Sequence, residues 1–234
     1  DSHEFCNQYR LESIIKKYSN YLPFPVKVDD KTINQVKAIW TLPKDEVSEE
    51  DYHEFFKQLT YDAQNPLFHL HLSIDAPIQY NALLYIPQEI TNEILYAREG
   101  KGLGLYAQRI FIQEDNKHLL PPYLRFVRGV IDSEDIPLNV SRESVQHNAL
   151  IEKIKKGVTS KILKELKQLS ESNPETYQSF WKQYGTLVKE GLTSDFSNKE
   201  KLIELLRFNS SLCDDDVHSV SMKDYVARMR DEQK

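Results

Sequence analysis

The chain has 234 residues, of which 40% are hydrophobic and 28% charged, a composition typical of a globular protein with a sizeable core. Its formal net charge of −6 argues against a nucleic-acid binder, which would carry a concentrated basic excess. Two cysteines, no apolar run near the roughly 20 residues that span a bilayer, and no signal-peptide pattern argue against disulfide-rich, membrane and secreted classes and favour the cytoplasm.

The N-terminal part of the chain alternates helix and strand patterns. Apolar residues at helical spacing predict a first helix from Glu4 to Asn20. Two strands, Phe24 to Val28 and Ile33 to Trp40, are expected to follow, with a turn between them. Ser48 and Asp51 form a capping-box pattern that predicts the start of a second helix.

Three more strands are predicted before residue 114. The first runs from Leu67 to Ile74, where apolar residues alternate with His69, His71 and a serine, so that one face is buried. The others are Ile78 to Ile86 and Leu103 to Gln113. These strands and helices predict a mixed α/β unit with a largely antiparallel sheet.

Two residue groups in this part resemble ligand sites. Gly100, Gly102 and Gly104 look like a phosphate cradle, but they precede a strand, whereas a dinucleotide fingerprint needs glycines between a strand and a helix. A flexible loop is the better interpretation. His69 and His71 share a strand face as two metal ligands would, but no third ligand lies nearby in sequence, so structural roles are expected.

The segment from Tyr123 to Asn148 reads YLRFVRGVIDSEDIPLNVSRESVQHN and contains several signals in one connection. Pro137 favours an extended, stiff approach to a helix that Ser141 is suited to cap. Arg142 then lies at or next to a helix N-terminus, where the dipole favours anions. A guanidinium and free amides at one place would suit a phosphate oxygen from outside the segment.

The same residues have simpler interpretations. Asp132, Glu134 and Asp135 are the residue types that bind Mg²⁺ or act as acid and base, but without a second carboxylate cluster a solvated turn is expected. From chemistry alone, the ordinary interpretation of Arg142 is a solvated arginine at a helix start that pairs with Glu143 or Asp135.

The last part of the chain is predicted to be mostly helical. An apolar stripe runs from Val145 to Leu169, and Asn173 precedes a proline that begins the next helix. A helix is expected from Lys199 to Phe208, and Ser221 opens a last one. Because the sequence stops without a closing element, we expect it to be cut from a longer protein.

The run GVIDSEDIPLNVSRESVQ closely resembles the catalytic-loop signature in the middle domain of the heat-shock protein 90 chaperones, with the bacterial, HtpG-like branch nearest. The resemblance covers essentially the whole chain, since other strings fall in the family's order. They are AIW at 38–40, LYAQRIFI at 105–112, FWKQYG at 180–185, LLRFNSS at 205–211 and DYVARM at 224–229.

This resemblance implies a division of the chain into three parts. A large α-β-α sandwich subdomain with a mixed, largely antiparallel sheet is expected over 1–144, with the arginine loop at its end. A helical connector is expected over 145–190 and a small α-β-α subdomain over 191–234. The fold class is therefore expected to be α/β in the α+β sense.

The resemblance also implies roles for particular residues. Arg142 matches the family arginine that reaches the γ-phosphate of ATP held in a separate N-terminal domain, and Gln146 matches a residue that supports the closed arrangement. His147 stands where the family often has glutamine, which leaves its role open. Trp40 matches a tryptophan at an exposed, client-contacting edge, although a core aromatic is the ordinary interpretation.

ATP and Mg²⁺ are implied only for the full-length protein, in an N-terminal domain outside this sequence, so this segment alone is expected to hydrolyse no ATP. The implied partners are the protein's own N-terminal ATPase and C-terminal dimerisation domains, partly folded client proteins and co-chaperones, with neither nucleic acid nor membrane among them. The alternative is a stand-alone protein-interaction module that makes no catalytic contribution.

Overall fold

The structure is a computed structural model that describes residues 7–96, 101–138, 149–211, 220–230 and 232. Its α-helices are α1 (Gln8–Tyr18), α2 (Glu49–Thr60), α3 (Asn92–Tyr96), α5 (Ala149–Ser172), α6 (Pro174–Ser194), α7 (Lys199–Leu205) and α8 (Met222–Ala227). Its strands are β1 (Lys27–Val28), β2 (Lys31–Thr32), β3 (Phe68–Ile74), β4 (Tyr80–Ile86), β5 (Leu103–Ala107), β6 (Ile110–Asn116) and β7 (Arg128–Ser133). Short 3₁₀ helices are η2 (Ile39–Thr41), η3 (Lys44–Glu46), η4 (Lys117–Leu119), η5 (Pro122–Leu124) and η6 (Phe196–Asn198).

The main sheet has five strands in the order β3-β4-β7-β5-β6. All neighbouring pairs are antiparallel except β5 and β7, which are parallel. The mixed, largely antiparallel sheet is therefore confirmed. The central strand, β7, is also the last of the five in sequence, and the arginine loop follows it.

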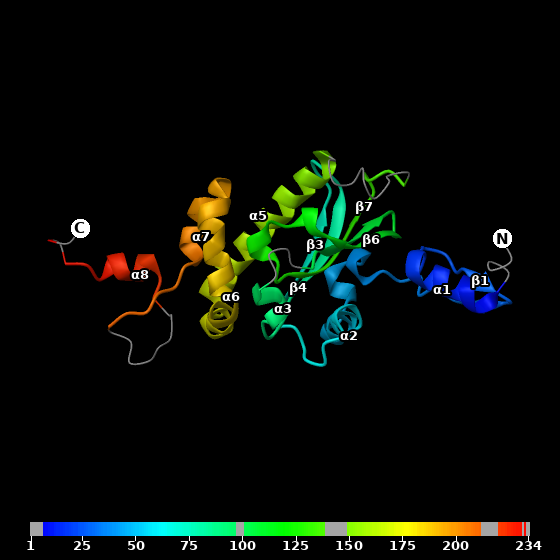
Figure 1. Cartoon of the computed structure of the whole chain (residues 1–234), viewed down its shortest axis with the longest axis horizontal. Helices are drawn as coiled ribbons and strands as arrows, with labels where there is room; N and C mark the ends of the chain where they lie inside the picture. The colour runs from blue at the N-terminus through cyan, green and yellow to red at the C-terminus, as the bar shows by residue number, and fades with distance from the viewer. Residues whose placement is uncertain (1–6, 97–100, 139–148, 212–219, 231, 233–234) are drawn as a thin grey trace.

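Helices cover both faces of this sheet, as Figure 1 shows for α5 on one side and α2 on the other. Neighbouring residues of β4 divide between the two sides, because side chains alternate along a strand. Leu84 belongs to the larger core with α5 and α6, whereas Leu83 belongs to the smaller core with Trp40 and α2. This is the α-β-α sandwich that the family resemblance implied.

The predicted helix starts are confirmed where the structure describes them. Ser48 accepts a hydrogen bond from the Asp51 amide, and the Asp51 carboxylate accepts one from the Ser48 amide, so the capping box is complete. Ser221 and Asp224 form the same pair at α8, and the Asn173 side chain accepts from the amide of the third residue of α6.

The predicted strand from Ile33 to Trp40 is wrong. β1 and β2 form a minimal hairpin around Asp29 and Asp30, both of which have positive φ. The Asn34 side chain then forms hydrogen bonds with nearby backbone groups. It accepts one from the Val26 amide and donates to two backbone carbonyls. Side-chain hydrogen bonds of this kind compete with a strand ladder, and the segment ends instead in η2.

The single strand predicted from Leu103 to Gln113 is also wrong, because it is a hairpin of β5 and β6. Gln108 and Arg109 form the turn with φ values of 51° and 65°. Neither is a residue that usually marks such a turn, so no sequence signal predicted it. The Asp132 carboxylate supports the turn by accepting a 3.1 Å hydrogen bond from the Arg109 amide.

The remaining differences are at the ends of elements. The connection between β4 and β5 contains α3, which was not predicted, and the helix predicted to reach Phe208 ends at Leu205. Phe208 instead pairs with Val220 in an isolated antiparallel bridge. α1 and α8 lie at opposite ends of the molecule (Figure 1). The division into three subdomains stays a prediction.

Candidate functional site: the base of the arginine loop

Arg142 and Gln146, together with Ser141 and His147, lie outside the described residues. The structure does describe the strand that precedes these residues and the helix that follows them. On one side β7 ends at Ser133, in the middle of the sheet, and on the other side α5 begins at Ala149. Ile151, in the first turn of α5, is buried in the same core as Ile131 of β7. Both ends of the loop therefore stand on the packed sandwich.

The chain leaving β7 is fixed by hydrogen bonds to the residue before β4. Ser133 Oγ donates to the Gln79 carbonyl at 2.7 Å, and the Asp135 carboxylate accepts from the Gln79 amide at 2.8 Å. Ile136 follows with 1% exposure, as a core residue. Ser133, Asp135 and Ile136 thus have defined anchors, and the chain turns outward only at Pro137 and Leu138, which are exposed.

The prediction of a solvated acidic turn is right for Glu134 and Asp135 but wrong for Asp132. Asp132 is 4% exposed and accepts hydrogen bonds from Trp40 Nε1 at 3.0 Å and from the Arg109 amide. A buried carboxylate needs such donors, because desolvation without them is costly. Asp132 therefore joins β7 to η2 and to the β5–β6 turn.

Trp40 is fully buried, so the exposed edge position that the resemblance implied is wrong for this residue. Its ring lies 4.6 Å from that of Tyr21, 4.9 Å from Tyr106 and 5.5 Å from Phe55. With these neighbours and the Asp132 hydrogen bond, the indole has no free face. The structure thus favours the core interpretation, and a client contact would need the surrounding aromatic residues to move.

His69 and His71 lie on the α2 side of β3, as the alternation predicted. His71 Nδ1 accepts from the Tyr52 hydroxyl at 2.7 Å, and its Nε2 donates to the Trp40 carbonyl at 3.1 Å. The His69 ring stacks on the Tyr52 ring at 4.2 Å. Burial lowers the pKa of both imidazoles, so they are neutral at pH 7. These are structural roles.

The glycines do not form a phosphate cradle. Gly104 lies within β5, and the Gly102 amide donates to the Asp115 carboxylate. A side chain on Gly102 would overlap the Asn116 backbone, so this glycine permits two chain segments to approach closely. Gly100 lies outside the described residues. Within the described part of the chain, no group of three His, Cys, Asp or Glu residues could hold a metal ion.

One ion pair was not predicted from the sequence. Arg125 is 8% exposed, and its guanidinium makes two hydrogen bonds to the Glu190 carboxylate, at 2.5 and 2.9 Å. It also donates to the carbonyls of Ile94 and Pro122. The pair connects the segment before β7 to α6. Its two residues lie 65 positions apart in sequence, so no local sequence pattern predicts their contact.

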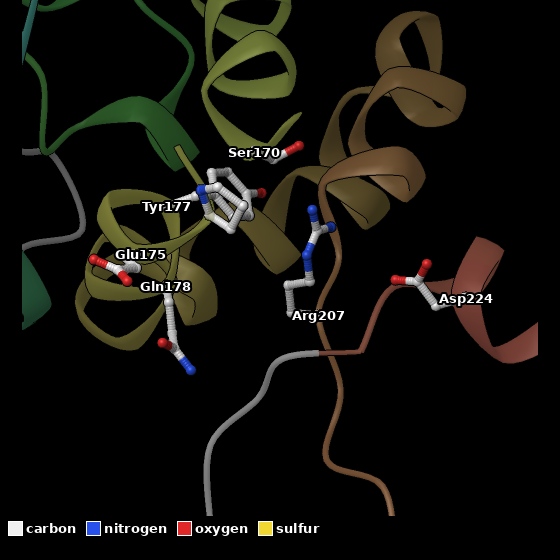
Figure 2. Close-up of a pocket in the computed structure, with 7 residues that line it drawn as sticks. Ser170, Glu175, Tyr177, Gln178, Arg207 and Asp224 are labelled. Atoms are coloured by element: carbon white, nitrogen blue, oxygen red, sulfur yellow. The ribbon is translucent and has the colours of Figure 1, made fainter. Parts of the chain in front are cut away.

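A pocket of about 300 Å³ lies between the start of α6 and α8, with Arg207 in it (Figure 2). The Arg207 guanidinium lies 4.7 Å above the Tyr177 ring, and its Nη1 donates to the Glu204, Leu205 and Leu206 carbonyls that end α7. Two carboxylates line the same pocket and would repel an anion. Arg207 is thus a structural arginine and no substitute for Arg142.

Among the described helices, none combines the length and the apolar character that crossing a bilayer would require.

Comparison with known proteins extends the resemblance. The family model described as Hsp90 protein matches residues 26–234. Chaperone protein HtpG of Nitratidesulfovibrio vulgaris is 42% identical over 234 residues, which is all of this chain and 37% of that protein. Chaperone protein HtpG of Francisella tularensis subsp. novicida is 45% identical over 238 residues, covering 95% of this chain and 38% of its own length. The chain thus spans little more than a third of the curated relatives that it matches.

Proposed function

The chain belongs to the Hsp90 family, and from this premise we propose that it is the middle segment of a bacterial-type, ATP-dependent chaperone. The relatives are chaperones more than twice as long as this chain, so a nucleotide-binding and a dimerisation domain fit in the remaining length. ATP and Mg²⁺ would bind in the N-terminal domain, where the metal offsets charge on the phosphates.

The observation that carries the catalytic part of the proposal is the anchoring of the loop that holds Arg142. Its base, at the end of the central strand β7, is fixed to Gln79, just before β4, by the Ser133 and Asp135 hydrogen bonds. An arginine finger contributes through position and charge, and a side chain held on a rigid base loses less entropy on docking. Arg142 would stabilise charge on the transferred phosphoryl group, and Gln146 would support the closed arrangement.

The same proposal assigns the partners. The segment would couple the N-terminal ATPase domain to the C-terminal dimerisation domain in a cytoplasmic homodimer, and it would contact partly folded clients and co-chaperones. The sandwich suits a coupling role, because the loop base, β7 and α5 share one packed core and move together.

The test is ATP turnover by the full-length protein. Arg142→Ala should lower kcat on the order of a hundredfold or more with a small change in KM, because the lost contact forms mainly in the transition state. Gln146→Ala should give a smaller loss. Arg228→Ala is the matched control, since Arg228 is an exposed arginine at the end of α8 and should leave turnover unchanged.

A second arrangement adds the 234-residue chain to the isolated N-terminal domain and compares the parent with Arg142→Ala. Turnover that rises with the parent and not with the variant supports the assignment. If Arg142→Ala hydrolyses ATP as fast as the parent in both arrangements, the catalytic role is refuted and the stand-alone interaction module is the better description.

A further inference from the structure

β3 is an edge strand whose outer side has no strand beside it in the described structure. Its partner is β4, and no backbone hydrogen bond from residues 68–74 to any other segment is found among the described residues. The opposite edge differs, because α1 packs near β6, with the Tyr18 and Phe111 rings 6.1 Å apart. An open edge presents a row of amides and carbonyls that can pair with another strand.

A groove of about 340 Å³ runs along this open edge. Five consecutive residues of β3, 68–72, line it. Since successive strand residues face opposite sides of a sheet, only a groove that approaches the strand from its edge can touch all five. Lys44, Glu49 and Tyr52 line it from the α2 side and Glu165 from α5, so the groove lies between the two helical layers.

We propose that this groove binds an extended polypeptide segment, which adds a strand beside β3. The source of that segment would be a partly folded client protein. This part of the inference rests on the proposed chaperone function. Backbone hydrogen bonds to the β3 edge would give affinity that does not depend on sequence, which suits a partner that varies. The groove floor, five residues long, matches about 13 Å of extended chain at 3.3 Å per residue.

The side chains of the groove floor also define a side-chain preference. Phe68, Leu70 and Leu72 face the larger core on the α5 side and offer apolar contacts. His69 and His71 face the α2 side, where the His69 ring stacks on Tyr52 and the His71 ring is hydrogen-bonded to the Tyr52 hydroxyl. The preferred segment would therefore alternate apolar residues with small polar residues.

The experiment measures binding of a fluorescent peptide of alternating valine and threonine to the 234-residue chain. The matched probe has the same side chains with its central amides N-methylated, which removes hydrogen-bond donors. We expect the methylated peptide to bind at least tenfold more weakly, because strand addition needs those donors. Amide hydrogen exchange at residues 68–72 should slow when the unmethylated peptide binds.

Glu165→Trp should weaken peptide binding at least tenfold, because a large side chain on α5 would fill the groove. Lys164→Trp is the matched control, since Lys164 is the exposed neighbour that does not line it. Both variants should keep the parent's circular dichroism spectrum.

Three results would overturn the proposal. The first is equal binding of the methylated peptide, which would mean apolar adsorption. The second is protection elsewhere, such as on the exposed Met222 and Tyr225 of α8. The third is dimerisation that protects residues 68–72 without peptide. None of these measurements involves ATP, so they fail or succeed independently of the Arg142 test.

Discussion

The Trp40 indole connects parts of the chain that lie 92 positions apart. It donates to the buried Asp132 carboxylate on β7 while three aromatic rings surround it. This single side chain therefore stabilises both the smaller core and the strand from which the arginine loop departs.

Trp40→Ala should lower the free energy of unfolding by about 3–5 kcal/mol, the usual cost of removing a large buried aromatic side chain. Trp40→Phe should cost less, because it keeps much of the packing and loses the Asp132 hydrogen bond. Urea denaturation measures both. Tyr61→Ala is the control for an aromatic residue that is 93% exposed, and it should change stability little. An unchanged stability in Trp40→Ala, with weaker client binding, would restore the client-contact role.

Residue roles were predictable from sequence where a periodic pattern defined them. The alternation of β3 predicted correctly that His69 and His71 share a face. The burial of Asp132 was not predictable, because acidic residues in a turn are normally solvated and its indole partner is distant in sequence. The role of Arg142 stays a prediction, and it came from a motif resemblance, which periodicity alone would not supply.

At the scale of elements, β7 depends on a glycine. Gly129 has a φ of 145°, which favours glycine, and a Cβ there would overlap the Leu83 carbonyl and lie 2.8 Å from Leu84 Cα. These obstacles are backbone atoms of the paired strand β4, which cannot rotate away.

Gly129→Ala should therefore destabilise the protein by about 3 kcal/mol, through strain and a displaced β4–β7 ladder. Gly104→Ala, in the neighbouring strand, is the comparison. Its Cβ would meet a Val130 methyl group at 3.2 Å, which can shift, so we expect a loss below about 1 kcal/mol. Thermal and urea unfolding measure both variants. Equal losses would show that the close approach at Gly129 is not limiting.

Elements were predictable when their ends carried a chemical signal. Capping residues at Ser48, Asn173 and Ser221 located three helix starts correctly. The Gln108–Arg109 turn carried no such signal, because its support comes from Asp132 on another strand. Tertiary contacts override local propensity at such positions.

At the scale of the whole molecule, Arg125 and Glu190 join the sheet to its helical layer. Glu190→Ala would leave a nearly buried guanidinium without its carboxylate. Because the Glu190 side chain is itself 46% exposed, we expect a loss of about 2 kcal/mol, below that of a fully buried pair. Lys167→Ala, which breaks the exposed pair with Glu204, should leave stability unchanged. Similar denaturation midpoints for the two variants would contradict this ranking.

Residue patterns predicted correctly a mixed α/β unit with a largely antiparallel sheet, and the α-β-α layering was implied by the family resemblance. The groove beside β3 was not predictable, because it depends on which strand lies at the edge. Strand order follows from long-range pairing, and nothing in residues 67–74 indicates that one side stays open.

The strand order has a consequence for biosynthesis. The β3–β4 and β5–β6 hairpins share no ladder with each other, and β7 fills the space between them. While a nascent chain emerges from the ribosome, these hairpins can form separately, but the sheet cannot close until residue 133 has been made. Arg142 is translated only after all five strands of the sheet have been made, and before α5 and α6, which cover one face of that sheet.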